Sequence, residues 1–230
     1  MKRVKDSVIR KNLFHRLILT NRCRLCGKVI AIKGTLCENC DPEKQRIDKK
    51  ALLLHTYCVK DFDRHTSPFY FDGDVRTGIH NLKYSGYKMY SEFFADEMVK
   101  VIERDFSDEK VDFFTCVPIT KRKKYIKGYN QCDFLIKLIS KAFGEKATPN
   151  LLVKIKETPN QVSLSRKERL TNLRGAFKVN EKYDVKGKTI LLCDDVVTTG
   201  STLSECAKTL RKAGAKKVIS VTASMKDEIF

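Results

Sequence analysis

Residues 189–203 read Thr-Ile-Leu-Leu-Cys-Asp-Asp-Val-Val-Thr-Thr-Gly-Ser-Thr-Leu. The apolar run at the start predicts a buried strand over Thr189–Cys193. Two carboxylates follow, and then a loop of hydroxyl residues and glycine leads into a helical pattern over 202–213. This order places the polar groups at the carboxyl edge of a sheet, where open α/β folds bind their ligands.

The rest of the chain alternates in the same way from Ala51 onward. Extended or strand-like segments are predicted at Leu52–Val59, Phe69–Phe71, Val111–Val117 and Val218–Ala223, with a polar loop over 60–68. Helical spacing covers 75–82, 91–104 and 129–143. Short apolar strands separated by helices predict a mainly parallel sheet flanked by helices. We therefore expect an α/β domain over residues 51–230, preceded over residues 1–50 by a basic arm, a cysteine module and a linker.

The chain is strongly basic, with 46 Lys and Arg against 28 Asp and Glu in 230 residues, a formal charge of +18. Residues 1–50 hold 14 basic and 5 acidic residues, and residues 119–180 hold 15 and 4. Two concentrated basic blocks favour a polyanionic partner, either nucleic acid or a phosphorylated small molecule. No apolar run approaches the roughly 18 residues of a membrane helix, so we expect no membrane span and a cytoplasmic protein.

Two Cys-x-x-Cys pairs lie in the N-terminal block. Their members are Cys23, Cys26, Cys37 and Cys40. Each pair puts two sulfurs on one side of a tight turn, and two such pairs can surround Zn²⁺ tetrahedrally. The alternative is two accidental pairs or a redox disulfide, which this spacing disfavours. Because no His lies within the segment, we expect a closed, structural site of four thiolates.

The loop after the acidic pair is suited to phosphate. Gly200 lets backbone N–H groups turn inward, and the following helix begins there. The alternative is an ordinary strand–turn–helix junction with a capping Ser or Thr. The chain has no G-x-x-x-x-G-K-[ST] motif, which argues against the P-loop of nucleoside triphosphatases.

Residues Asp194–Thr202 resemble the phosphoribosyl pyrophosphate (PRPP) motif of type I phosphoribosyltransferases. The resemblance implies that Asp194 and Asp195 contact the ribose hydroxyls, with Mg²⁺ on the pyrophosphate side. By position it assigns the ribose 5-phosphate to Thr198, Thr199, Gly200, Ser201 and Thr202. In the purine-salvage branch an acidic residue commonly stands where this chain has Thr198. Since Thr is not a general acid or base near neutral pH, this departure counts against purine salvage.

A second basic segment follows the Val111–Val117 strand directly and is predicted to be a loop. Its cations are Lys121, Arg122, Lys123, Lys124 and Lys127. Tyr125 and Tyr129 flank them, and such rings can stack on unpaired bases while the cations neutralise phosphates. The alternative is a solvated loop whose charge serves solubility.

The order of motifs along nearly the whole chain is similar to the ComF/GntX-like competence family. The motifs are, in order, the cysteine module, Asn81-Leu-Lys-Tyr-Ser-Gly86, Val117-Pro-Ile119, Lys127-Gly128-Tyr129-Asn130-Gln131, the series Gln161…Arg169…Asn172…Gly175-Ala-Phe177, and the PRPP motif. The family's usual Arg-Gly-Phe-Asn-Gln begins with Lys127 here and has Tyr129 for Phe, so cation and ring are kept but the bidentate guanidinium is not. The resemblance implies a phosphoribosyltransferase-like domain required for single-stranded DNA uptake in natural transformation, beside a competence DNA helicase or translocase. It also implies that the segment after the Val111–Val117 strand faces pyrophosphate, with Lys121 and Arg122 as the nearest candidates.

The long segment 157–175 is basic and rich in Gln and Asn, which favours a lid or a nucleic-acid contact. Its candidate residues are Gln161, Arg166, Arg169 and Asn172. Lys83 could extend the same surface, although its spacing from neighbouring tyrosines equally suits a partly buried helix face.

Three functions fit these patterns. The first is a PRPP-binding protein that handles single-stranded DNA in transformation. The second is an active Mg²⁺-dependent phosphoribosyltransferase, in which a nitrogen nucleophile attacks the anomeric carbon and pyrophosphate leaves. The third is a nucleobase-salvage enzyme whose charge serves substrate capture. They share a ligand and differ in turnover and in acceptor.

Overall fold

The computed structural model describes residues 21–31, 34–48, 61–85, 88–157 and 173–227. Its centre is a four-stranded sheet in the order β1 (Arg64–Thr66), β6 (Lys217–Met225), β5 (Thr189–Val197) and β2 (Phe113–Cys116). Every neighbouring pair in this sheet is parallel. The predicted α/β class with a parallel sheet flanked by helices is therefore confirmed.

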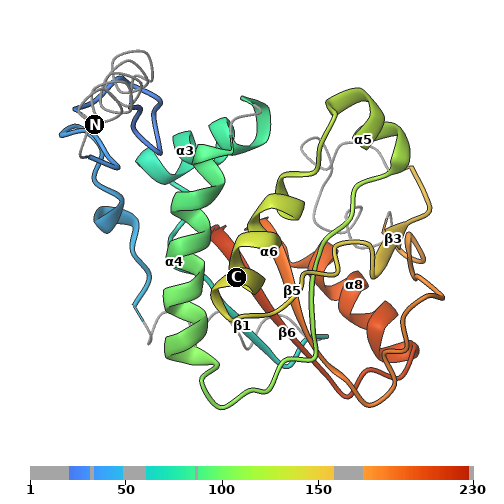
Figure 1. The fold of residues 1–230 in the computed structure, drawn as a ribbon. Coiled ribbons are helices and arrows are strands. Elements are labelled where there is room, and N and C mark those ends of the chain that lie inside the picture. The colour runs from blue at the N-terminus through green and yellow to red at the C-terminus, as the bar shows by residue number, and fades with distance from the viewer. Residues whose placement is uncertain (1–20, 32–33, 49–60, 86–87, 158–172, 228–230) are drawn as a thin grey trace, which may run out of the picture.

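Alternate side chains of β5 face two different cores. Leu191 and Cys193 pack with residues of α4 (Met89–Asp105) and α6 (Gln131–Ala142), whereas Ile190 and Leu192 pack with those of α8 (Ser201–Lys212). Figure 1 shows these helices on the two faces of the sheet. The strand is apolar on both faces because it is covered on both, as in other parallel sheets.

The helices predicted over 75–82, 91–104, 129–143 and 202–213 correspond to α3 (Gly73–Tyr84), α4, α6 and α8. The segment predicted as a basic loop is instead a helix, α5 (Lys121–Lys127). Thr120 caps it by accepting a hydrogen bond from the Lys123 N–H at 3.3 Å, and Gly128 ends it at φ 80°. None of its residues is buried, so it has no apolar stripe by which a sequence pattern could reveal it.

Several strands also differ from the predictions. The polar loop expected over 60–68 contains β1, in which His65 and Thr66 are buried and hydrogen-bonded to other elements. β5 continues through the acidic pair to Val197. A separate antiparallel pair, β3 (Leu152–Lys154) and β4 (Phe177–Val179), was not predicted. Around Phe69–Phe71 there are only isolated bridges, and Leu52–Val59 lies outside the described residues.

The expected linker after Cys40 begins with a short 3-10 helix, η1 (Pro42–Gln45). Asp41 caps η1 by accepting a hydrogen bond from the Glu43 N–H at 3.2 Å. Within the described ranges, no helix combines the length and the apolar character that crossing a bilayer requires.

The cysteine module shares its core with α3 and α4. Leu25, which lies between two of the cysteines, is fully buried, and its side chain lies over Gly78 of α3. A Cβ atom at Gly78 would lie 2.5 Å from Leu25 Cδ2 and 3.0 Å from Phe94 Cζ. The glycine therefore allows the module to approach the helix closely.

We predict that Gly78→Ala destabilises the protein. Alanine gains about 1 kcal/mol over glycine in a helix, whereas overpacking a core costs about 1–3 kcal/mol. Overpacking should win because Leu25 is tied to its neighbouring cysteines. Urea denaturation should show a lower free energy of unfolding, and Arg76→Ala, exposed on the same helix, should change it by less than about 0.5 kcal/mol. A more stable Gly78→Ala protein would contradict this packing.

Candidate functional site

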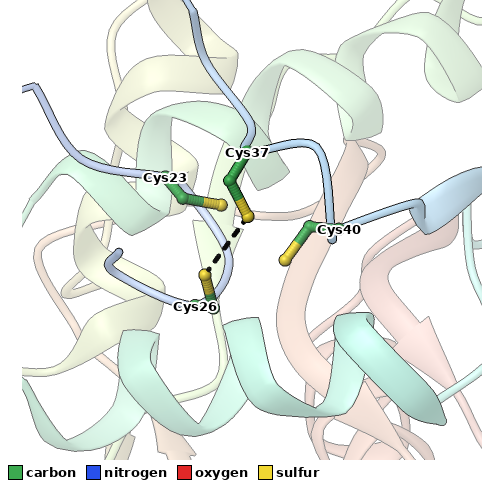
Figure 2. A group of neighbouring side chains, drawn as sticks. All are labelled: Cys23, Cys26, Cys37 and Cys40. Carbon is green, nitrogen blue, oxygen red and sulfur yellow. Dashed lines mark hydrogen bonds between the residues drawn. The ribbon is translucent and has the colours of Figure 1, made fainter. Parts of the chain in front are cut away.

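The four module cysteines turn their sulfurs toward one another (Figure 2). All four sulfur atoms lie within 4.8 Å of one another, and Cys26 and Cys37 are 3.6 Å apart. Sulfur ligands about 2.3 Å from a tetrahedral metal would stand about 3.8 Å apart. The geometry therefore fits a metal ion held by sulfur alone, which suits zinc or iron.

The surroundings of the cysteines shift the pKa of Cys23 and of Cys40 in opposite directions. Burial raises the pKa of Cys23, but hydrogen bonds from the backbone of Cys26, Leu25 and Cys37 outweigh it and lower that pKa to about 7. Burial, together with the neighbouring thiols, raises the pKa of Cys40. Four thiolates at this spacing repel one another, and a bound cation removes that cost.

The acidic pair lies at the carboxyl end of β5, as the sequence predicts. Asp194 is half-buried and Asp195 is buried. Asp194 Oδ1 accepts hydrogen bonds from the Asp195 N–H at 2.9 Å and from the Cys132 thiol at 3.4 Å. Burial, followed by the charge of Asp195, raises the pKa of Asp194 to about 7.

Both oxygens of Asp195 are engaged by residues from other elements. Lys83 Nζ of α3 lies 3.1 Å from Oδ1, and Gln131 Nε2 of α6 donates to Oδ2 at 2.5 Å. Burial would lower the pKa of Lys83, but attraction to Asp195 outweighs it and raises that pKa. Lys83 therefore belongs to this site, and is not merely part of an extended surface.

The Lys127–Gln131 motif reaches the same carboxylate through Gln131. Lys127 Nζ donates to Gln131 Oε1 at 2.5 Å and lies 4.6 Å from the centre of the Tyr129 ring. The Tyr129 hydroxyl donates to the Lys83 carbonyl oxygen at 2.9 Å. Asn130 caps α6 by accepting from the Cys132 N–H at 3.3 Å, and its amide donates to the Val117 carbonyl oxygen at 3.1 Å.

The loop at 198–202 begins α8, and its backbone favours an anion. Gly200 has φ 70° and caps the helix, whose N–H groups and dipole favour negative charge. The hydroxyls of Thr199 and Ser201 lie 2.7 Å apart at the same turn. Thr198 and Thr202 flank this turn and are half-buried.

A cleft of 480 Å³ opens beside the site, between α5 and the β3–β4 pair. Its basic lining residues are Lys121, Lys124, Lys154 and Lys178. Lys124 pairs with Asp133 at 2.6 Å, and Lys178 pairs with Glu181 at 2.6 Å. No residue from 194–202 lines this cleft. Arg122 is exposed on α5 and Lys123 is half-buried there.

The structure thus joins Lys83 and Gln131 directly to the acidic pair, whereas exposed lysines of α5 lie along the neighbouring cleft. Gln161, Arg166, Arg169 and Asn172 lie outside the described residues. The contacts of Lys83 and Gln131 with Asp195 were not predicted, because they join positions 112 and 64 residues apart in the chain. The family motifs contained Lys83, Gln131 and Asp195, but they did not show that these residues contact one another.

The parallel sheet, with a carboxylate pair and an anion loop at its carboxyl edge, is the arrangement expected of a phosphoribosyltransferase domain. Residues 135–228 match the family described as phosphoribosyl transferase domain. Among solved structures, the chain is similar to the glutamine PRPP amidotransferase of B. subtilis, with a TM-score of 0.42 and 18% identity, over 63% of this chain and 30% of that one.

Relatives match over more of the chain. It is 26% identical to competence protein F of Haemophilus influenzae over 85% of this chain and 81% of that protein. It is also 26% identical to DNA utilization protein YhgH of Escherichia coli K12, over 85% of this chain and 86% of that protein. The resemblance to the ComF/GntX-like competence family is confirmed by these relatives, and residues 135–228 match the phosphoribosyl transferase domain.

The raised pKa of Asp194 predicts a pH-dependent cost to stability. Between 3.8 and about 7 the folded protein keeps a proton that the unfolded chain has released. Stability is therefore lost as the pH rises through this window. Asp194→Asn removes the titrating group and keeps an oxygen for the Asp195 N–H. Urea unfolding should show the variant to be more stable than wild type at about pH 8, with the difference shrinking toward about pH 4.

Asp112 provides a control, because the same Asp→Asn change there should have the opposite effect on stability. A hydrogen bond from the Thr189 N–H lowers the pKa of Asp112, so Asp112→Asn should cost stability at neutral pH. An Asp194→Asn protein whose gain does not depend on pH would contradict the assignment of the titration to this carboxyl.

Proposed function

We propose that this protein binds PRPP at the Asp194–Thr202 segment and handles single-stranded DNA during DNA uptake in natural transformation. The observation that carries the proposal is the meeting, at one sheet edge, of a carboxylate pair, one half-buried and one buried, with a loop of hydroxyls and N–H groups that begins α8. A phosphorylated sugar needs both: carboxylates accept hydrogen bonds from its hydroxyls, and the helix start favours its phosphate.

In this proposal each part of the ligand has its own residues. Thr198, Thr199, Gly200, Ser201 and Thr202 bind the 5-phosphate. Asp194 and Asp195 accept from the ribose hydroxyls, and Lys83, Lys127, Lys121 and Arg122 supply positive charge toward the pyrophosphate. Bound Mg²⁺ would neutralise pyrophosphate charge.

We further propose that the metal of the four-cysteine module is Zn²⁺ in a structural role. Four sulfur ligands close the coordination shell, so no position is open for a substrate or water. Thiolates persist in a reducing compartment, which supports a cytoplasmic protein.

The DNA proposal is supported by α5, by the adjacent cleft and by the names of the relatives. Tyr125 on α5 is 91% exposed, which leaves its ring free to stack on a base. Lysines of α5 and of the β3–β4 pair line the cleft, and their positive charge would favour the phosphates of a single strand. A DNA helicase or translocase that delivers single strands is the partner this role requires. The segment with Gln161, Arg166, Arg169 and Asn172 stays a predicted lid or DNA contact.

An active Mg²⁺-dependent phosphoribosyltransferase is the second candidate, and one observation favours it. Burial and the Asp195 charge raise the pKa of Asp194 to about 7. A carboxyl group with that pKa can accept a proton from a nitrogen nucleophile near neutral pH. Pyrophosphate release that requires an added acceptor would establish turnover, whereas binding without release would favour the first role.

We predict that Asp195→Ala abolishes PRPP binding in the presence of Mg²⁺. The change removes hydrogen bonds to a charged acceptor and should weaken binding by at least about tenfold. Calorimetry with the wild type and the variant measures this. Asp195→Asn, which keeps the size of the side chain, guards against a folding defect, and Asp184→Ala in an exposed turn is the control. Equal affinity in wild type and the Asp195 variants would remove the ligand assignment.

We predict that replacing Lys121, Arg122, Lys123 and Lys124 together by Ala weakens single-stranded DNA binding similarly for all sequences. Each phosphate contact contributes about 0.7 to the slope of log K against log salt, so the slope should flatten by up to about 3. Fluorescence anisotropy at several salt concentrations measures it.

The matched control removes the same charge from the opposite edge of the sheet. It replaces Lys182, Lys186, Lys212 and Lys216, which are exposed and precede β5 or β6. If both quadruple variants flatten the slope equally, binding follows net charge and α5 is not the DNA site.

A further inference from the structure

Helix α3 connects the cysteine module to the acidic pair. Asn81 Nδ2 donates to the carbonyl oxygen of Leu25, within the module, at 2.7 Å. Two residues later, Lys83 Nζ lies 3.1 Å from Asp195 Oδ1. A single rigid helix thus contacts both the metal-binding cysteines' loop and the carboxylate of the candidate ligand site.

The module holds this part of the molecule at several points. Leu25 packs over Gly78 of α3 with no gap between them. Arg24 Nη1 donates to the Met89 carbonyl oxygen at 3.2 Å, and the same guanidinium pairs with Glu92 of α4. After the last cysteine, the Asp41 N–H donates to Asp74 Oδ2 in the first turn of α3 at 2.9 Å.

These contacts come from residues between or beside the four cysteines. Their positions therefore depend on the turns that the cysteines form. Such short turns have little core of their own, so a bound metal is what fixes them.

The end of α3 that carries Lys83 is also held by contacts with other elements. The side chain of Lys83 is 28% exposed and that of Asp195 only 6%, so their ion pair is largely shielded from water. The Tyr129 hydroxyl holds the Lys83 carbonyl oxygen at 2.9 Å. Removing one partner of a buried pair leaves an uncompensated charge, which costs far more than an exposed pair contributes.

We propose that Lys83 positions Asp195 for its ligand and that the metal-bound cysteine module fixes Lys83 through Leu25 and Asn81, so that metal and phosphosugar bind cooperatively. The inference rests on the proposed binding of PRPP. Linkage requires the coupling to be reciprocal: if metal strengthens PRPP binding, PRPP must strengthen metal binding by the same factor.

The test uses the full-length zinc-loaded protein and measures zinc release to a chromogenic chelator, with and without PRPP and Mg²⁺. PRPP should slow the release by about fivefold or more, the usual lower range of allosteric coupling. Calorimetry on the same samples measures PRPP binding independently. The Asp195→Ala protein, which should not bind PRPP, is the control. Any effect of PRPP on its zinc release comes from PRPP acting directly on zinc and not from binding at the site.

Variants that spare both the cysteines and the aspartates identify the route. Asn81→Ala should bring the release rates with and without PRPP together, and so should Lys83→Met when calorimetry shows that its site is saturated with PRPP, whereas Lys83→Arg should restore the difference. Asn180→Ala is the matched control for Asn81, since Asn180 Nδ2 also donates to a backbone carbonyl, that of Asn150, at 3.2 Å. Lys188→Met, which breaks an ion pair with Asp112 at 3.4 Å, is the control for Lys83. If Lys83→Met does not fold, Asn81→Ala decides.

Two failures are distinguishable. If PRPP binds but leaves zinc release unchanged, or if the Asn81 and Lys83 variants keep the full effect, the coupling is wrong and the proposed function stands. If calorimetry detects no PRPP binding, the proposed function fails and the coupling fails with it.

Discussion

The parallel pairing of β5 with both β2 and β6 is the constraint on which the site depends. Asp194 lies opposite Thr222 of β6, and Cys193 lies opposite Cys116 at the end of β2. Because neighbouring parallel strands end at the same edge, the acidic pair, the start of α8 and the segment after β2 must share one surface. A slip of one residue would turn Asp195 into the opposite face and bury its neighbours wrongly.

Placing carboxylates in this edge creates an electrostatic cost that the surrounding elements offset. Asp195 pairs with Lys83 of α3 and accepts a hydrogen bond from Gln131 of α6. Asp194 accepts hydrogen bonds from the Cys132 thiol and from the Asp195 N–H. Asp194 nevertheless has a pKa raised to about 7 by burial and by its neighbour. An electrostatic cost to folding stability that remains at a site is typical of residues kept for binding and not for stability.

The sequence predicts what periodicity and motif order encode. The four longer helices and the central strands follow from apolar spacing, and the Cys-x-x-Cys pairs meet as their spacing requires. Two elements, α5 and β1, could not be predicted from the sequence, and the reasons are physical. α5 buries nothing and so has no stripe, and β1 is the polar sequence Arg-His-Thr. Its burial depends on distant partners: His65 Nδ1 lies 2.9 Å from Ser220 Oγ, and Thr66 donates to Asp105 Oδ2 at 2.5 Å.

The same limit applies to the candidate site. The loop at 198–202 and the acidic pair are contiguous in the chain, so a local motif is enough to find them. Lys83 and Gln131 meet Asp195 only because α3 and α6 cross the edge of the sheet, and no local pattern contains that geometry. Lys83 stands beside exposed Tyr84 at a helix end, where the sequence pattern left both an extended surface and a partly buried helix face open. The helix that carries Lys83 to Asp195 is the one that Leu25 of the cysteine module approaches closely at Gly78. Under the proposed coupling, this glycine would help to hold Lys83 at the acidic pair.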